Sequence, residues 1–472
     1  MASRGVSVRQ LLSSASAFSP SPCYSIAQSV RVRVLSPRLV NRGFGSTPVR
    51  QTDGVYSGLT DGRPRVPWIE AFRQQQEGKT KTISSDGPKP EERDMTLCYP
   101  LGRDPSLSDT YISSSGHIRL GSILMDLDAL SGIIVYKHTG PNVTTVTAAL
   151  DRITIAHPLT EICDLEYSGQ VTYVSGRSSA EVTCKVARAR KEGEMPDDPL
   201  LTCTFTMVAL NPETERPTHI PRLICETAEE EKIFKISEAK ALAKKEMLKT
   251  SLLEKAPTDS ESALIHKIWL RHVAYNAASN TLRRPRHVIA MSKTVLSTAN
   301  IMQPQYRNRH QTMIFGGFHL KQAFELAFCC AASFAHARPT FISADPCTFR
   351  NPVPVGSVLY VKATVVYTDP SLFEEDESEP SQRDAAAPLT RIHVRVNSKV
   401  RGVEDELARP TGQFNYIFTV PKDIHVLPRT YQEFMMYVDA WRRVRAFDAQ
   451  DRRDHLDVDS QRRFPEDTNV TE

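Results

Sequence analysis

Several common functional signatures are missing from this 472-residue chain. No stretch holds about 18 consecutive apolar residues, so no membrane-spanning helix is expected. The nine cysteines form no Cys-x-x-Cys pair, which argues against zinc ribbons and thioredoxin-like sites. No Gly-x-Ser-x-Gly motif occurs, which argues against an α/β-hydrolase, and no metal-binding cluster is evident. The apolar content of 40% is nevertheless sufficient for a globular fold.

The first 50 residues contain no acidic residue and no lysine, but seven arginines and eleven serines. This composition is typical of a mitochondrial transit peptide, and we expect processing near Arg42-Gly43-Phe44. Beyond residue 50 the chain holds 52 Lys and Arg against 55 Asp and Glu. The formal net charge of +4 therefore originates in the N-terminal segment, and no nucleic-acid partner is expected.

The chain contains an internal repeat with a period of 194 residues. The segment Asp151-Arg-Ile-Thr-Ile-Ala-His-Pro158 aligns with Asp345-Pro-Cys-Thr-Phe-Arg-Asn-Pro352, and the alignment continues without gaps for another 15 residues. Upstream of these segments, Gly121 and Gly317 each precede an apolar run with helical spacing. Alternating segments rich in β-branched residues follow each helix. The sequence therefore predicts two copies of one α+β unit, a helix followed by antiparallel strands.

Two segments interrupt this pattern. Residues 226–262 are rich in Glu, Lys and Ala and predict an exposed connecting helix, with an ion pair between Glu231 and Lys235. We interpret its charges as a solvated face rather than a binding patch. Residues 371–388 are acidic and contain proline, which predicts a disordered hairpin insertion.

Three segments resemble a known family. IMQPQYRNRHQTMIFGGFHLKQAFEL (301–326), NPVPVGSVLYVKATVVYTD (351–369) and HIRLGSILMDLDALSG (117–132) are similar to the mitochondrial acyl-coenzyme A thioesterase 9 family. The resemblance implies a tandem, or double, hotdog fold of the α+β class, in which each unit wraps a curved antiparallel sheet around a long central helix. It also implies hydrolysis of fatty acyl-CoA to free fatty acid and CoA in the mitochondrial matrix, without a cofactor. The chains are then expected to form a homo-oligomer, a trimer of double-hotdog chains.

The repeat and the resemblance together give an expected domain organisation. The sheets of the two units are expected to join edge to edge, which protects those edges. The expected parts are a transit peptide (1–50), an N-terminal extension (51–94), hotdog unit 1 (95–225), a charged linker helix (226–262), hotdog unit 2 (263–425, including the insertion 371–388), and a C-terminal helix with a polar tail (426–472).

Asp128 is the predicted catalytic acid. It follows Gly121 by seven residues, which brings it within about 20° of the same helical face. A carboxylate on an otherwise apolar helix is costly to bury unless it is paired or functional. In the families that the chain resembles, the catalytic Asp has this spacing and acts as base or nucleophile; the alternative is a buried acid bonded to backbone. Asp126 is rotated by about 200° and is expected to face solvent.

The two copies retain different site residues. The second copy has no acid seven residues after Gly317, and Glu325 is displaced by one residue, as a degenerate partner or a second functional carboxylate. Conversely, the second copy has Asn308 before its glycines, where the first copy has a serine-rich loop. The resemblance implies that such an Asn orients the attacking water or the carbonyl. We therefore predict one composite site, Asp128 of unit 1 with Asn308 and the Gly316-Gly317 turn of unit 2. The pseudo-site, with Glu325 and the serine-rich loop, is predicted to be weak or silent.

The glycine turn and its polar neighbours complete the candidates. Backbone N–H groups at a helix N-terminus carry partial positive charge, so a thioester oxygen could approach Gly316 and Gly317. Tight helix–sheet packing would also explain these glycines. The secondary candidates are His310 and His117 as hydrogen-bonding residues, and Arg307 and Arg309 as ligands of the CoA phosphates.

Two other functions remain compatible with the sequence. A hotdog dehydratase or hydratase of 3-hydroxyacyl thioesters needs a His–acid pair, and His310 precedes Glu325 by 15 residues. The Phe-Gly-Gly context fits that reaction poorly. A non-catalytic acyl-CoA-binding protein would keep the fold after losing the chemistry. Release of free CoA, and its loss on changing Asp128, separate these functions from hydrolysis.

Overall fold

The computed structural model describes residues 95–114, 116–140, 142–155, 162–189, 199–248, 252, 255–276, 284–308, 313–369 and 389–446. The predicted transit peptide, N-terminal extension, acidic insertion and polar tail lie outside these residues. In the described part of the chain, no helix combines the length and the apolarity needed to cross a membrane.

The described residues of the first repeat form one long helix, one short helix and six antiparallel strands. Helix α4 (Leu120–Thr139) is buried along almost its whole length, and Gly121 is its second residue. The predicted helix and the strands that follow it are confirmed. The sequence analysis did not predict the first strand and the short helix, which come before α4. The elements other than α4 are β1 (Met95–Tyr99), α3 (Pro105–Tyr111), β2 (Thr144–Leu150), β3 (Ile153–Ile155), β4 (Leu165–Val174), β5 (Ser179–Arg188) and β6 (Leu201–Leu210).

The second repeat has the same plan. Its helix α7 (Gly316–Ala335) begins at the glycine pair. The strands of this repeat are β8 (Leu296–Ile301), β9 (Thr340–Ala344), β10 (Cys347–Phe349), β11 (Val358–Asp369), β12 (Thr390–Arg401) and β13 (Arg409–Val420).

Between the repeats, the part of the chain that the structure describes forms two helices, where the sequence predicted one connecting helix. The additional elements are α5 (Ala228–Leu248), α6 (Asp259–Asn276), β7 (Val288–Ala290), the 3-10 helix η1 (Met291–Lys293) and β14 (His425–Leu427), which pairs in parallel with β7. A helix over residues 431–446 ends the described chain, as predicted.

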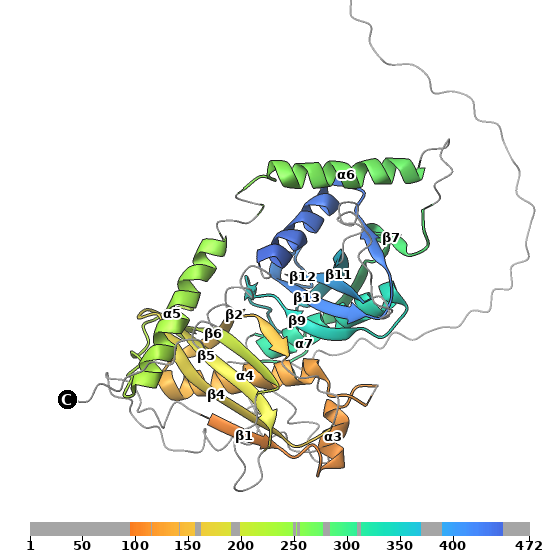
Figure 1. The fold of residues 1–472 in the computed structure, drawn as a ribbon. Helices are drawn as coiled ribbons and strands as arrows, with labels where there is room; N and C mark the ends of the chain where they lie inside the picture. Colours follow the sequence, from red (N-terminus) through yellow and green to blue (C-terminus); the bar gives the residue numbers. More distant parts are fainter. Residues whose placement is uncertain are drawn as a thin grey trace, which may run out of the picture. The chain divides into compact units, whose positions relative to one another are not determined.

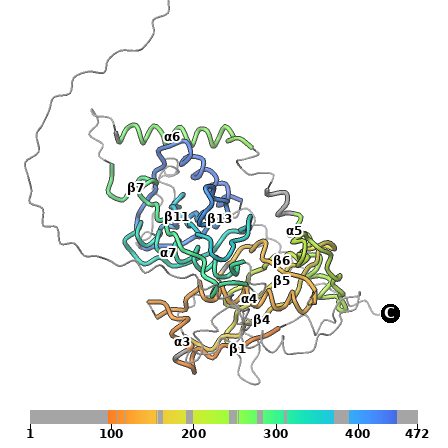
Figure 2. Tube along the Cα trace, turned by 180° about the vertical axis from the view of Figure 1, so that it is seen from behind, coloured from red at the N-terminus to blue at the C-terminus, as the bar shows by residue number. Residues whose placement is uncertain are grey.

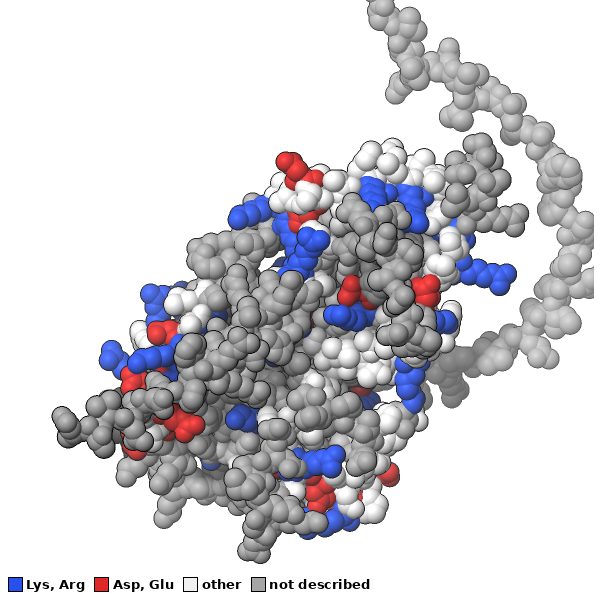
Figure 3. Space-filling model, viewed as in Figure 1, with Lys and Arg blue, Asp and Glu red and all other residues white. Residues whose placement is uncertain are grey.

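Helix α5 is exposed along most of its described length and contains the predicted ion pair between Glu231 and Lys235, at 2.8 Å. It also packs on the first repeat, because the rings of Phe234 and Tyr173 of β4 lie 5.1 Å apart. Figure 3 shows basic and acidic side chains on the described part of one face. The charges of α5 therefore belong to a solvated surface that still contacts the sheet.

All strands of the two repeats belong to one twelve-stranded sheet, with the order β1-β4-β5-β6-β2-β10-β13-β12-β11-β8 along its main path. The repeats join where β2 pairs antiparallel with β10 and β3 pairs antiparallel with β9. Figure 1 shows β4, β5 and β6 beside α4, and β11, β12 and β13 beside α7. Figure 2 shows the same grouping from behind. The predicted double hotdog, with its edge-to-edge junction, is confirmed.

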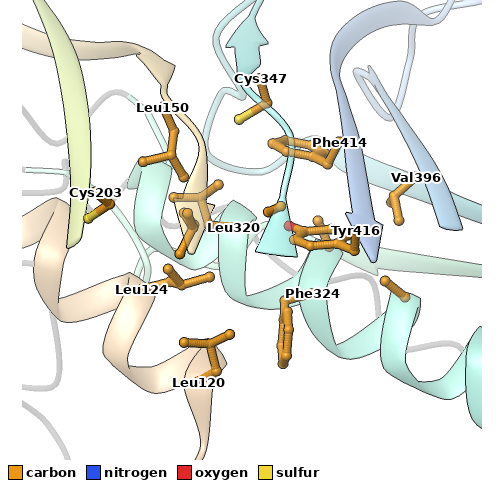
Figure 4. Close-up of a cluster of buried hydrophobic side chains, with 14 of the residues drawn as sticks. Leu120, Leu124, Leu150, Cys203, Leu320, Phe324, Cys347, Val396, Phe414 and Tyr416 are labelled. Atoms are coloured by element: carbon orange, nitrogen blue, oxygen red, sulfur yellow. The ribbon is translucent and has the colours of Figure 1, made fainter. Parts of the chain in front are cut away.

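Helices α4 and α7 pack directly against each other. In Figure 4, Leu120 and Leu124 of α4 lie in one buried cluster with Leu320 and Phe324 of α7. A Cβ atom added to Gly317 would lie 2.8 Å from the backbone oxygen of Met125 on α4. The glycine thus allows the start of α7 to touch the backbone of α4, which brings the two repeats together at the predicted site.

Candidate active site

Asp128 lies in the middle of α4, with only 1% of its surface exposed. Its Oδ1 accepts a hydrogen bond from the Thr147 hydroxyl of β2 at 2.7 Å. Its Oδ2 accepts one from the backbone N–H of Gly317 of α7 at 2.6 Å. A carboxylate of the first repeat therefore contacts the helix N-terminus of the second repeat, where the positive end of the helix dipole favours negative charge.

The protonation of Asp128 reflects opposing influences. Burial disfavours the charged carboxylate and raises its pKa from 3.8 to about 6, and this is the larger effect. The hydrogen bonds from Thr147 and Gly317 favour the charged form and lower the pKa. The result is a carboxylate that is ionised at neutral pH and more basic than an exposed Asp, which suits a general base.

Asn308 and Asp128 line the same cavity, whose volume is about 500 Å³. The Oδ1 atom of Asn308 is buried and has no hydrogen-bond partner in the described part of the chain. Such an unsatisfied acceptor in the cavity wall can accept a hydrogen bond from a water or from an amide N–H of the substrate. Most of the cavity wall is apolar, with Ile133 of α4, Met207 of β6 and Leu359 of β11 among its residues.

The predicted glycine turn is at the cavity, but one of its two N–H groups is already bonded. Gly316 lines the cavity and is the first residue of α7, so its N–H has no partner within the helix. Gly317 donates its N–H to Asp128. A thioester oxygen can therefore approach the Gly316 N–H, whereas the Gly317 N–H holds the acid in place.

Thr147 is a cavity residue that the sequence analysis missed. The pairing of β2 with β6 is irregular between Thr147 and Ala149, where β2 contains a bulge. Bulges change the direction of side chains next to active sites. A threonine in a strand-like segment gives no signal of this kind, because its register depends on the partner strand.

At the predicted pseudo-site, the acid of the second repeat is paired with a basic side chain. Glu325 forms an ion pair with Arg119 at 2.5 Å, and both side chains are partly exposed. A Cβ added to Gly121 would approach Lys321 at 3.3 Å and Glu325 at 3.5 Å. The start of α4 thus faces the middle of α7, as the start of α7 faces Asp128, but an arginine from the first repeat pairs with the displaced acid.

The secondary candidates are not brought together. Arg307 lines the cavity, and Arg350, which the sequence analysis did not select, lines it as well and is exposed. His117 is exposed and is not among the cavity residues. Arg309 and His310 lie outside the described residues.

The expectation that Asp126 faces solvent is wrong. Asp126 is fully buried and accepts a hydrogen bond from the Tyr111 hydroxyl. Helix α4 is covered on nearly every face by the sheet, by α7 and by α3, so a rotation of about 200° from Asp128 leads to another buried surface. A single amphipathic face cannot be assumed for a central helix.

Among the residues that the structure describes, no group of three or more His, Cys, Asp or Glu side chains could hold a metal ion.

Comparison with known proteins finds relatives among the acyl-coenzyme A thioesterases. No protein-family model matches the chain. Mitochondrial acyl-coenzyme A thioesterase 9 of Mus musculus is 32% identical over 357 residues, which are 74% of this chain and 76% of the relative. The thioesterase 9 of Bos taurus is 33% identical over 364 residues, 75% of this chain and 78% of the relative. An acyl-ACP thioesterase structure from Bacteroides thetaiotaomicron, at 11% identity and a TM-score of 0.38, covers 70% of this chain and is itself covered fully.

Proposed function

Because this chain belongs to the acyl-coenzyme A thioesterase 9 family and is a thioester hydrolase, we propose that it hydrolyses fatty acyl-CoA at one composite site between its repeats. The observation that supports this most directly is the contact between Asp128 of α4 and the Gly317 N–H of α7, at the cavity that Asn308 also lines. Neither repeat supplies all of these groups. The site consists of Asp128, Asn308, Gly316 and Gly317.

The reaction needs a nucleophile, an oxyanion site and a departing thiol. Asp128 either takes a proton from the water that attacks the thioester carbonyl or attacks the carbonyl itself. The Gly316 N–H and the Nδ2 amino group of Asn308 donate hydrogen bonds to the carbonyl oxygen as negative charge develops on it. When water is the nucleophile, the carbon–sulfur bond then breaks and the CoA thiolate takes the proton from Asp128. When Asp128 is the nucleophile, the thiolate departs and leaves an acyl anhydride of Asp128; water hydrolyses this anhydride to the free acid and the Asp128 carboxylate, and the proton released goes to the thiolate. The products are a free fatty acid and CoA.

Arg307 and Arg350 are proposed to bind the CoA phosphates. Both line the cavity, and Arg350 is exposed at its surface. A guanidinium group binds phosphate through two parallel hydrogen bonds. At an exposed site, this attraction weakens as the ionic strength rises. The apolar wall along α4 and β6 then remains for the acyl group.

The location and the assembly of the chain are further proposals. The acid-free N-terminus and the mitochondrial relatives support import into the mitochondrial matrix. Import of a reporter fused to residues 1–50 tests this, with the seven arginines replaced by glutamine as the control. Trimers of the double-hotdog chain are proposed by resemblance, and light scattering would then give three times the chain mass.

The decisive experiment measures thiol release from short- to long-chain acyl-CoAs. Asp128→Asn is expected to lower kcat by about 10²- to 10⁴-fold, the usual effect of removing a positioned base. Glu325→Gln, a matched change of a carboxylate in the other repeat, is expected to have little effect. Equal losses in the two variants would contradict the single composite site. Absence of thiol release from every acyl-CoA, with the wild-type protein folded, would contradict hydrolysis.

A further inference from the structure

His319 is a buried histidine that the proposed reaction does not use. It lies in the first turn of α7, three residues after Gly316, and only 2% of its surface is exposed. It lines the same cavity as Asp128 and Asn308. Its Nε2 atom is buried and has no hydrogen-bond partner within the ranges that the structure describes.

The surroundings of His319 are aromatic. Its ring meets those of Phe349 and Phe414 edge to face, with centroids 5.7 Å and 5.1 Å apart. This burial lowers its pKa to about 4, so the imidazole is neutral at physiological pH. A neutral imidazole offers one hydrogen-bond donor and one acceptor.

A polar atom without a partner in an apolar binding cavity acts as a recognition element. Ligand cavities are mostly apolar, and a few polar groups fix the orientation and the identity of the ligand. A leucine or phenylalanine at position 319 would place an apolar side chain beside Phe349 and Phe414 and would leave no unsatisfied nitrogen. The histidine is therefore expected to meet a polar group of the substrate.

We propose that His319 determines acyl-group specificity by hydrogen bonding to a hydroxyl on the acyl chain, so that hydroxyacyl-CoA thioesters are the preferred substrates. This inference rests on the hydrolase function proposed above. The hydroxyl takes no part in the chemistry and stays on the released acid. His319 acts as a specificity-determining residue of the proposed reaction.

A hydroxyl fits this environment better than other polar substituents. It both donates and accepts, so it can pair with either neutral tautomer of the imidazole. A keto group only accepts, and a carboxylate would favour an imidazolium, which burial disfavours. Because an α-helix rises about 1.5 Å per residue, His319 lies about 4.5 Å along α7 from Gly316. The hydroxyl is therefore expected within a few carbons of the thioester.

The test compares matched pairs of substrates with the complete chain. Thiol release is measured with butyryl-CoA and decanoyl-CoA and with their 2-hydroxy and 3-hydroxy derivatives. For each pair, kcat/KM of the hydroxylated substrate is divided by kcat/KM of the plain substrate. The wild-type ratio is expected to exceed one for at least one hydroxyl position. His319→Leu is expected to lower this ratio by about 10- to 100-fold, the effect of one buried polar pair. Hydrolysis of the plain substrate should remain.

Two further variants separate recognition from packing. His319→Gln keeps a donor and an acceptor and is expected to retain part of the preference. Ile133→Val removes one methylene from the same cavity, and its ratio should equal that of the wild type.

Three outcomes would overturn the proposal. The first is a wild-type ratio of one or less at every position, which decides the matter even if His319→Leu does not fold. The second is an equal loss for plain and hydroxylated substrates in His319→Leu, which would indicate a contact with the pantetheine arm or a packing role. The third is formation of an enoyl-CoA, followed by its absorbance, without thiol release. Failure to cleave even plain acyl-CoA would instead contradict the proposed function itself.

Discussion

At the scale of single residues, the Asp128 carboxylate is controlled by its immediate neighbours. Burial raises its pKa to about 6, while the Thr147 hydroxyl and the Gly317 N–H act in the opposite direction. Both donors bond the charged form, so they also fix the orientation of the carboxylate. The same two bonds thus influence the acidity and the geometry of the proposed base.

The pH profile should report this balance. We predict that kcat/KM falls as the pH drops through about 6, because Asp128 must be ionised to act. Thr147→Val removes a donor that lowers the pKa, so the acidic limb should move to higher pH, by about one unit. Profiles from pH 5 to 9 measure this. Thr145→Val, at a cavity residue of the same strand, is the control. An unchanged limb, or a shift to lower pH, would contradict the role of Thr147.

The same pKa shift predicts an effect on stability. The pKa of Asp128 is raised in the folded state, so the native protein binds this proton more tightly than the unfolded chain. The stabilisation is complete below about pH 4 and is lost as the pH rises through about 6. As the pH rises between these limits, the free energy of unfolding of the wild type should therefore fall by roughly 3 kcal/mol relative to that of Asp128→Asn. Urea unfolding of both proteins at pH 4 and pH 7 measures the change, and a difference that is independent of pH would contradict it.

Helical spacing together with the family resemblance led to Asp128, the resemblance led to Asn308, and the structure brings both to one cavity. Spacing could identify Asp128 because an acid is rare on an apolar helix. It could not identify Thr147 or His319, because their importance depends on what lies across the cavity. It also misjudged Asp126, since a helical-wheel argument assumes that one face of the helix meets solvent.

At the scale of secondary structure, helix α7 depends on α4 for its start. The residue before it, Phe315, provides no side-chain cap, and Asp128 accepts the Gly317 N–H instead. An acid at this position satisfies one of the unpaired N–H groups of the first turn. Asp128 is therefore both the proposed base and the cap of a helix in the other repeat.

Gly317→Ala should disturb both roles. The new Cβ would lie 2.8 Å and 2.9 Å from backbone atoms of Met125, so the helices must move apart. We expect a loss of about 1–3 kcal/mol in stability, since overpacking outweighs the gain in helix propensity. The displacement of Asp128 should lower kcat by about 10²-fold. Thermal unfolding and thiol release measure the two effects.

Gly132→Ala is the matched control for the stability measurement. A Cβ at Gly132 has only Met207 nearby, at 4.0 Å, so this variant should be as stable as the wild type or more stable. Equal stability of Gly317→Ala and Gly132→Ala would contradict the close contact between the helices.

At the scale of the whole molecule, the two repeats differ in what lies at the two helix starts. At the start of α7 are Asp128 and the cavity with Asn308. At the start of α4 is the ion pair of Arg119 and Glu325. The duplication therefore supplies two similar surfaces, and only one of them has the complete set of proposed catalytic groups.

One ligand per chain is the expected consequence. A non-hydrolysable thioether analogue of acyl-CoA should bind with a stoichiometry of one per chain in isothermal titration calorimetry. Glu325→Gln, which removes the charge opposite Arg119, should leave the stoichiometry unchanged. Two equivalent sites per chain would contradict the composite arrangement.

The sequence by itself determined the tandem repeat, the helix-and-strand order of each unit and the acid of the first repeat. The helices, the strands and the repeat follow from patterns that can be read along the chain, and the choice of the acid also used the family resemblance. Only the tertiary structure decided which N–H group bonds Asp128, that Arg119 pairs with Glu325, that Asp126 is buried and that His319 reaches the cavity. Each of these depends on how α4, α7 and the joined sheet pack against one another, and packing brings together residues almost 200 positions apart.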